Sequence, residues 1–256
     1  MKLKGRLAFT LAEVLIVLGI IGMVAEMTLP TLINSTSKQT EISQLKKFYS
    51  SFEQGMSMYL TSQNCSDLGC TGAFTGSVPD GAWQTAMLGA LGQVFKGVIK
   101  CGDSECAESI KKLDGTSLGS FFSTSSDDVQ GYKLADGTMF AFDDNDDDNC
   151  PLYANVSKIS GVCAYVYVDL NASKQPNRYG RDIFIFILAN DGALQPFLGI
   201  EHTKYVSNDV NYSGKATYWR NNVNNCGTFG STAIPSGVVG GGCAARIMEN
   251  AWMMDY

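Results

Sequence analysis

The feature that most constrains this chain is a long apolar stretch at its N-terminus. After a basic opening, MKLKGR, the sequence stays largely apolar as far as Ile33, and its only charges before Lys38 belong to Glu13 and Glu26. About 20 apolar residues in a helix span a bilayer, so the stretch is long enough to cross one. The basic opening favours a cytoplasmic N-terminus, with the rest of the chain on the other side. The sequence therefore predicts a single-pass membrane protein with an exported C-terminal part.

A cleaved secretory signal and a simple anchor are the ordinary explanations of such a stretch. A secretory signal needs small residues at its cut site, whereas the best-placed site, at Ala25, has Met23 where a small residue belongs. A carboxylate inside a membrane span is costly and usually has a functional partner, so a simple anchor does not account for Glu13. Glu26 is explained either by a contact with Thr28 or by a position near the outer interface.

The residues around Glu13 resemble the class III signal of type IV pilins and type II secretion pseudopilins. The match is a short leader ending at Ala8, followed from Phe9 by FTLAEVLIVLGIIG. In that family prepilin peptidase cuts before the Phe and methylates the new amine, so the resemblance implies cleavage between Ala8, which replaces the usual Gly, and Phe9. Pro30 falls where many pilins carry a helix-kinking proline. The implied partner of Glu13 is the free Phe9 amine of a neighbouring subunit.

The helix is expected to continue beyond the membrane and to pack on a folded domain. Apolar residues at steps of three and four predict a buried stripe, with Glu41 among the polar residues of the other face. The stripe consists of Ile42, Leu45, Tyr49, Phe52, Met56 and Tyr59. The expected parts are a leader (1–8), an N-terminal helix (9–60, with 9–33 transmembrane and 34–60 amphipathic) and an exported domain (61–256).

Strand signals lie in the second half of the exported domain. Asp136-Gly137 is a two-residue hairpin turn between apolar segments at 132–134 and 138–142. Further strands are expected at 162–170, 182–189 and 194–198, and helices at 82–98 and 243–254. Antiparallel strands behind a long helix indicate an α+β fold. The resemblance narrows this to a pilin-like fold, in which the helix packs on an antiparallel sheet with disulfide-pinned loops.

Two later segments are similar to bacterial pseudopilin-like proteins. One is the strand end Val168-Asp169-Leu170-Asn171, with Pro176-Asn177 and Gly180-Arg181-Asp182 after it, and the other is the tail CAARIMENAWMMDY. The resemblance therefore covers both ends and the middle of the chain. Residues 61–130 carry no part of it, and their role stays open.

The eight cysteines all follow the apolar stretch, which suits disulfides in an exported domain. Short separations favour sequential closure, although many other pairings are open. Zinc is the alternative, but the two closest pairs have four intervening residues where zinc knuckles usually have two. The favoured pairs are Cys65–Cys70, Cys101–Cys106, Cys150–Cys163 and Cys226–Cys243.

Carboxylates crowd the loop at 143–148, and Ca²⁺ takes roughly six to eight oxygen ligands. A calcium site and a solvated acidic loop are the two explanations, since the spacing completes no EF-hand. Asp169, Asn171 and Asp182 form a second oxygen-rich group, in which Asp182 also suits a turn cap. The candidate calcium ligands are Asp144, Asp146 and Asp148.

Catalytic and nucleic-acid functions are disfavoured. With 19 Lys and Arg against 25 Asp and Glu, the chain has no obvious basic face for phosphates. Because His202 is its single histidine, most metal sites and catalytic mechanisms that depend on histidine are excluded. Gly115–Gly119 matches a nucleophile elbow around Ser117, but an elbow must follow a buried strand and open a helix, and Lys111-Lys112-Leu113-Asp114 does not read as a core strand.

The resemblance implies a structural subunit and not an enzyme. It would be a type II secretion pseudopilin, anchored in the bacterial inner membrane with its C-terminal domain in the periplasm or outside the cell. Its implied partners are other pilin-like subunits in a pilus or pseudopilus, prepilin peptidase and the inner-membrane assembly platform. One alternative is a minor type IV pilin in adhesion or DNA uptake. Another, from a different class, is a membrane-anchored serine hydrolase using Ser117 and His202.

Overall fold

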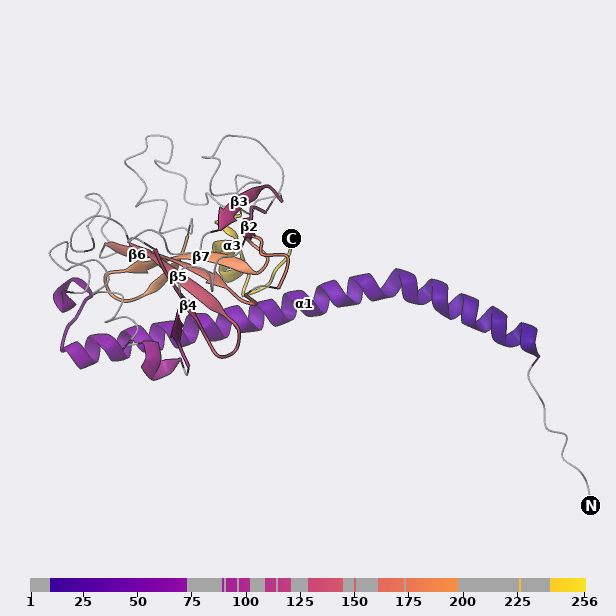
Figure 1. Cartoon of the computed structure of the whole chain (residues 1–256), viewed down its shortest axis with the longest axis horizontal. Helices are drawn as coiled ribbons and strands as arrows, with labels where there is room; N and C mark the ends of the chain where they lie inside the picture. Colours follow the sequence, from indigo (N-terminus) through magenta and orange to yellow (C-terminus); the bar gives the residue numbers. More distant parts are fainter. Residues whose placement is uncertain are drawn as a thin grey trace, which may run out of the picture. The chain divides into compact units, whose positions relative to one another are not determined.

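A computed structural model gives the fold of the chain (Figure 1). It describes residues 10–72, 89, 91–95, 97–101, 109–113, 115–120, 129–144, 150, 161–172, 174–197, 226 and 240–256. The chain forms two units, Met1–Thr40 and Glu41–Tyr256. One long helix, α1 (Leu11–Gln63), enters both, and the remaining elements all belong to the second unit.

The first unit is the apolar part of α1. This helix is long and apolar enough to cross a membrane, with a mean hydropathy of 2.0 in its most apolar window and no residue of that window buried. Pro30 lies inside the helix, where it removes one backbone donor. The hydroxyls around it donate to carbonyls one turn back, as Thr28 does to Val24 and Thr36 to Leu32, both at 2.9 Å. The long N-terminal apolar helix predicted from the sequence is present.

The second half of α1 forms one wall of the core of the second unit. Its buried stripe includes five of the six predicted residues, while Tyr49 is half-buried and Phe48 is buried one position before it. Glu41, expected on the polar face, is also buried, because the stripe reaches one residue round the helix from Ile42. Phe48 contacts the ring of Phe140 on the sheet, with 5.5 Å between ring centroids.

The sheet is antiparallel, and its strand order is β1-β4-β5-β6-β7-β8. Side chains alternate between its faces: Phe140 and Phe142 join the core cluster under α1, and Met139 and Ala141 join a second cluster on the other face. The strands are β1 (Ile99–Lys100), β4 (Val129–Lys133), β5 (Met139–Asp144), β6 (Val162–Asp169), β7 (Ile183–Ala189) and β8 (Leu194–Pro196). The α+β class and the expected hairpin are thus confirmed.

Three short elements were not expected from the sequence. The strand β1 lies at the edge of the sheet, and β2 (Ser109–Lys111) and β3 (Ser117–Ser120) form a separate pair. All three are too short and too polar to give an alternating pattern. In the expected helix at 82–98, residues 91–94 are helical, Leu91 and Phe95 are buried, and most of the remainder lies outside the described residues.

The C-terminal helix is shorter than expected. It runs from Cys243 to Glu249 as α3 and not as far as residue 254. Ala251 and Trp252 have φ of 54° and 64°, a left-handed conformation that cannot continue a right-handed helix. The amide of Trp252 donates to the carbonyl of Ile247 at 2.7 Å, which closes the helix end.

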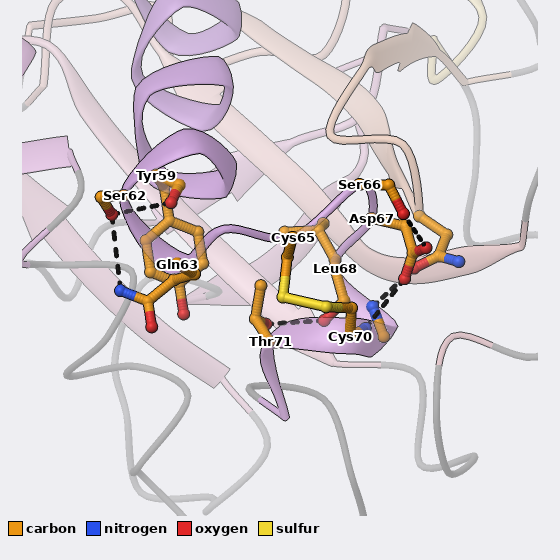
Figure 2. The surroundings of a disulfide bond; sticks show 11 residues. Tyr59, Ser62, Gln63, Cys65, Ser66, Asp67, Leu68, Cys70 and Thr71 are labelled. Carbon is orange, nitrogen blue, oxygen red and sulfur yellow. Dashed lines mark hydrogen bonds between the residues drawn. A yellow bond between two sulfur atoms is a disulfide. The ribbon is translucent and has the colours of Figure 1, made fainter.

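Disulfides join Cys65 to Cys70, Cys150 to Cys163 and Cys226 to Cys243, as the sequential pairing predicted. Cys101 is also disulfide-bonded, and Cys106 lies outside the described residues. Figure 2 shows the first of these bonds in the turn that follows α1. There the amide of Cys70 donates to the carboxylate of Asp67, and the amide of Leu68 to the carbonyl of Asn190, so the closed turn is held against the end of β7.

Candidate functional site: the apolar helix and its carboxylates

The apolar half of α1 exposes large side chains in every direction. Residues at 14–18, which cover more than a full turn, are between 47% and 63% exposed. A helix of a water-soluble protein normally has a polar face, and one that is apolar all round needs lipid or other helices around it. The exposed side chains continue through Leu29 to Ile33. The exposed apolar side chains of this helix therefore require lipid or other helices around them.

Glu13 closes the N-terminus of this helix. Its Oε2 accepts hydrogen bonds from the backbone amide of Thr10 at 2.7 Å and from the Thr10 hydroxyl at 2.8 Å. The amide of Glu13 donates in turn to the Thr10 Oγ1 at 3.2 Å. This is a capping box, in which each residue satisfies an amide that the first turn leaves without a carbonyl. The predicted cleavage residues, Ala8 and Phe9, lie outside the described residues.

Glu26 is the second carboxylate of the apolar stretch. The Thr28 hydroxyl donates to the Val24 carbonyl at 2.9 Å and not to Glu26, so the suggested contact between Glu26 and Thr28 is wrong. Pro30 has no amide hydrogen, and it stands at the position from which the Glu26 carbonyl would receive its helical bond. Glu26 therefore combines a carboxylate with a backbone carbonyl that lacks its helical hydrogen bond, inside an apolar segment.

The second oxygen-rich group lies in the turn between β6 and β7, where its carboxylates accept hydrogen bonds from the turn. The Asp169 carboxylate accepts from the amides of Asn171 and Ala172 at 2.9 and 3.0 Å. Asp182 accepts from the amide of Asn177 at 2.8 Å, that of Arg178 at 2.6 Å and the Asn171 side-chain amide at 3.3 Å. Burial raises the pKa of Asp182, and the amides of Arg178 and Asn177 oppose that rise. These acids hold backbone in place.

The predicted calcium loop lies mostly outside the described residues. Asp144 ends β5, whereas Asp146 and Asp148 are not among the residues described. Within the described ranges, no three His, Cys, Asp or Glu side chains are grouped as metal ligands. Calcium binding at this loop stays a prediction from the sequence.

The hydrolase alternative finds no elbow at Ser117. This residue begins the short strand β3, which pairs with β2, so it does not stand between a buried strand and a helix. Its side chain is exposed, and His202 lies outside the described residues. The described part of the chain therefore gives Ser117 no nucleophile geometry.

The C-terminal tail carries a charged cluster that sequence reasoning missed. Arg246 is buried, its Nε lies 2.7 Å from Oδ1 of Asp255, and its guanidinium stacks on the Tyr256 ring with 5.0 Å to the centroid. The Tyr256 hydroxyl donates to the Gly180 carbonyl at 2.7 Å. The sequence signal was a basic residue, Arg246, in a tail helix whose other charged residue is Glu249. This cluster anchors the tail, and it lies in the second unit.

Comparison with models of protein families, with curated proteins and with solved structures finds no match. A function for this chain therefore rests on its own residues. Of these, the exposed apolar helix and its carboxylates at positions 13 and 26 are the ones whose setting demands a partner.

Proposed function

We propose that this protein is a non-enzymatic, pilin-like structural subunit that assembles with other such subunits into a filament. It is inserted in the bacterial inner membrane through the apolar half of α1, trimmed between Ala8 and Phe9 by prepilin peptidase, and added to the filament by an inner-membrane assembly platform. The folded second unit is exported. The resemblance of the N-terminal segment favours a type II secretion pseudopilin, with a minor type IV pilin as the second candidate.

The observation that carries the proposal is the carboxylate of Glu13 at the start of a helix that is apolar all round. Lipid alone would accommodate the apolar side chains, but it gives a carboxylate no compensating charge. Cleavage before Phe9 would create an α-amine, a cation that every copy of this chain would carry. A parallel neighbour shifted by roughly four residues, about 6 Å along the axis, would bring its amine level with Glu13.

The second unit supports an exported location. Three disulfides join cysteines of the described chain, and disulfides persist in the periplasm and outside the cell but are rare in the cytosol. The basic opening of the chain assigns the other end of the helix to the cytoplasm. Both features agree with one orientation across the inner membrane.

The first test is the intact mass of the protein from its native membranes, before and after reduction. A chain that begins at a methylated Phe9 and gains eight hydrogens on reduction is the expected result. A chain that still begins at Met1, or one cut near Ala25, would contradict processing by prepilin peptidase and leave an anchored or secreted domain.

The role of Glu13 is tested with two substitutions. Glu13→Ala removes both the cap and the charge, whereas Glu13→Gln keeps an acceptor for the Thr10 amide, since Gln also closes capping boxes. Both variants should insert and form their disulfides. If the charge pairs with a neighbour, both should lose at least about nine-tenths of their incorporation into sedimentable filaments. Normal incorporation of Glu13→Gln would leave the carboxylate with a capping role only.

A further inference from the structure

The two ends of the sheet differ in their place along α1. One end holds the β4–β5 turn and the β6–β7 connection (residues 170–182), because Met139, which follows the turn, pairs with Asp169, which precedes the connection. Lys47 of α1 lies 2.7 Å from Asp136 in the β4–β5 turn. This end of the sheet therefore lies beside the first residues that α1 contributes to the second unit, and we call it the near end.

The opposite end, the far end, is acidic. It holds the β7–β8 turn, where Gly192 lies against the side chain of Leu60, so it is beside the C-terminal residues of α1. Residues 56–72 and 187–194, which form this end, carry two acids and no lysine or arginine. The formal charge of −6 for the whole chain therefore conceals an uneven distribution of charge.

The β6–β7 connection brings cations to the near end. Its three basic residues face a single acid, Asp182, which is fully buried and accepts hydrogen bonds from the amides of Asn177 and Arg178. A fourth cation comes from β2, since the Lys111 amide donates to the Asn177 carbonyl at 2.8 Å and Lys111 forms a bridge with Arg178. We call these four residues the basic surface: Lys111, Lys174, Arg178 and Arg181.

The described part of the chain does not neutralise the basic surface. None of its four members takes part in an ion pair there, and the buried Nε atoms of Arg178 and Arg181 meet no acceptor among the described residues. Lys174 is exposed, and the other three are half-buried. Arginine and lysine together suit phosphate groups, which a guanidinium binds through paired N–H donors.

The length of the chain between the apolar stretch and the second unit limits how far this surface can lie from a membrane. Glu41, the first residue of the second unit, comes eight positions after Ile33, where the apolar stretch ends. Within α1 this is a rise of roughly 12 Å, of which lipid headgroups would occupy about 5–8 Å. Glu41 and Ile42 are buried, so the second unit covers α1 from its first residues. Its near end therefore begins within about one Debye length, roughly 8–10 Å, of the headgroups.

We propose that the basic surface binds the phosphate groups of anionic phospholipids in the membrane that α1 crosses. Each lysine or arginine close to such a membrane strengthens binding about fivefold, and the acidic far end disfavours the reverse orientation. This contact rests on the membrane insertion in the proposed function, and it requires neither cleavage before Phe9 nor a filament. It would hold the exported unit against the membrane before assembly.

Lysine labelling of the full chain in vesicles tests the contact. The chain is reconstituted with its exported unit outside, and acylation of Lys111 and Lys174 is followed by mass spectrometry. Both should react at least about fivefold more slowly in mixed phosphatidylcholine and phosphatidylglycerol than in phosphatidylcholine alone. The difference should fall below twofold at 1 M salt, where the Debye length is about 3 Å. Equal rates in the two kinds of vesicle would refute the contact.

Two double variants separate the basic surface from net charge. Arg178→Gln with Arg181→Gln should lose most of the protection of Lys174. Lys100→Gln with Lys133→Gln removes the same charge from β1 and β4 and should leave that protection within twofold of the wild type. Equal losses in the two double variants would contradict a specific surface.

Further controls identify the occupant. If millimolar inorganic phosphate protects the lysines equally well in phosphatidylcholine vesicles, the surface binds a free anion and the lipid contact is wrong. It is also wrong if protection without phosphatidylglycerol rises with the protein-to-lipid ratio, since the occupant is then another copy of the chain. Flotation with the vesicles separates the two proposals: a chain that floats without protection refutes the lipid contact alone, whereas a chain that does not float refutes membrane insertion as well.

Discussion

Asp182 is the buried acid whose removal should destabilise the fold most. Its side chain is fully buried and accepts three hydrogen bonds, from the amides of Asn177 and Arg178 and from the Asn171 side chain. A buried donor left without an acceptor costs about 1–3 kcal/mol. The Asn177 amide is buried and the other two donors are part-buried, so Asp182→Ala would lose at most about 3–9 kcal/mol from these three. Burial of the carboxylate raises its pKa and disfavours its charged form, and the substitution removes that penalty. The expected net loss is therefore about 2–6 kcal/mol.

Asp182→Asn separates hydrogen bonding from charge. Its amide oxygen can replace the Oδ2 of Asp182, which accepts from Asn177 and Asn171, but its NH₂ group then faces the Arg178 amide. One donor is stranded instead of three, so the expected loss is about 1–3 kcal/mol. We therefore predict that the wild type is the most stable, Asp182→Asn is intermediate and Asp182→Ala is the least stable.

The assay is thermal unfolding of the full chain in detergent micelles, with disulfides intact. A unit of this size loses about 2–4 °C of melting temperature per kcal/mol, which gives a fall of about 4–24 °C for Asp182→Ala. The control is Lys47→Ala, which removes an exposed pair with Asp136 at 2.7 Å and should cost no more than about 1 kcal/mol. Equal melting temperatures for Asp182→Ala and the control would refute the reasoning.

Two further perturbations concern the C-terminal tail. Gly180 has φ +77°, and a Cβ there would collide with the Cys243 sulfur, so Gly180→Ala should lower stability by about 2–5 kcal/mol. The control is Gly137→Ala, at φ +91° with open space around it, which should cost only about 1–2 kcal/mol. Equal melting temperatures for the two variants would contradict the collision. The hydrogen bond from Arg246 lowers the pKa of Asp255, so the pair stabilises above the unfolded pKa of this acid, about 3.9, and loses its effect as the pH falls through the lower folded value. Melting curves from pH 5 to pH 2 should fall less steeply for Arg246→Gln, and identical slopes would remove this pair from the acid response.

The parts of the fold that the sequence predicted are those governed by local rules. The hairpin over β4 and β5 follows from alternating apolar residues on either side of Asp136-Gly137, and both properties are local. The pairing of Cys65 with Cys70 follows equally from a short separation. The membrane-length helix follows from hydropathy alone.

The parts that it did not predict depend on contacts between distant segments. The pair β2–β3 lacks an apolar pattern, and it is held partly by bonds from Lys111 to the Asn177–Tyr179 segment. Glu41 is buried although it precedes the apolar stripe. Arg246 likewise meets Asp255 only because the left-handed residues at 251 and 252 turn the tail back. No spacing in the sequence encodes these encounters.

The sequence identified Glu13 as a residue of the candidate site, but it did not predict the hydrogen bonds that Glu13 makes. The sequence singles out Glu13 because a carboxylate in an apolar stretch needs a partner, and the structure shows that the isolated subunit supplies one through Thr10. Cleavage between Ala8 and Phe9 would leave that cap intact, since Thr10 keeps its amide and hydroxyl. In the proposed filament, a neighbour's amine would therefore compete with a hydrogen bond that already exists.

This competition sets the energetic condition for the proposed assembly. Loss of an N-terminal cap typically costs about 0.5–2 kcal/mol, and the charge pair between subunits must exceed that cost if Glu13 abandons Thr10. A lone contact near this threshold would be readily reversible.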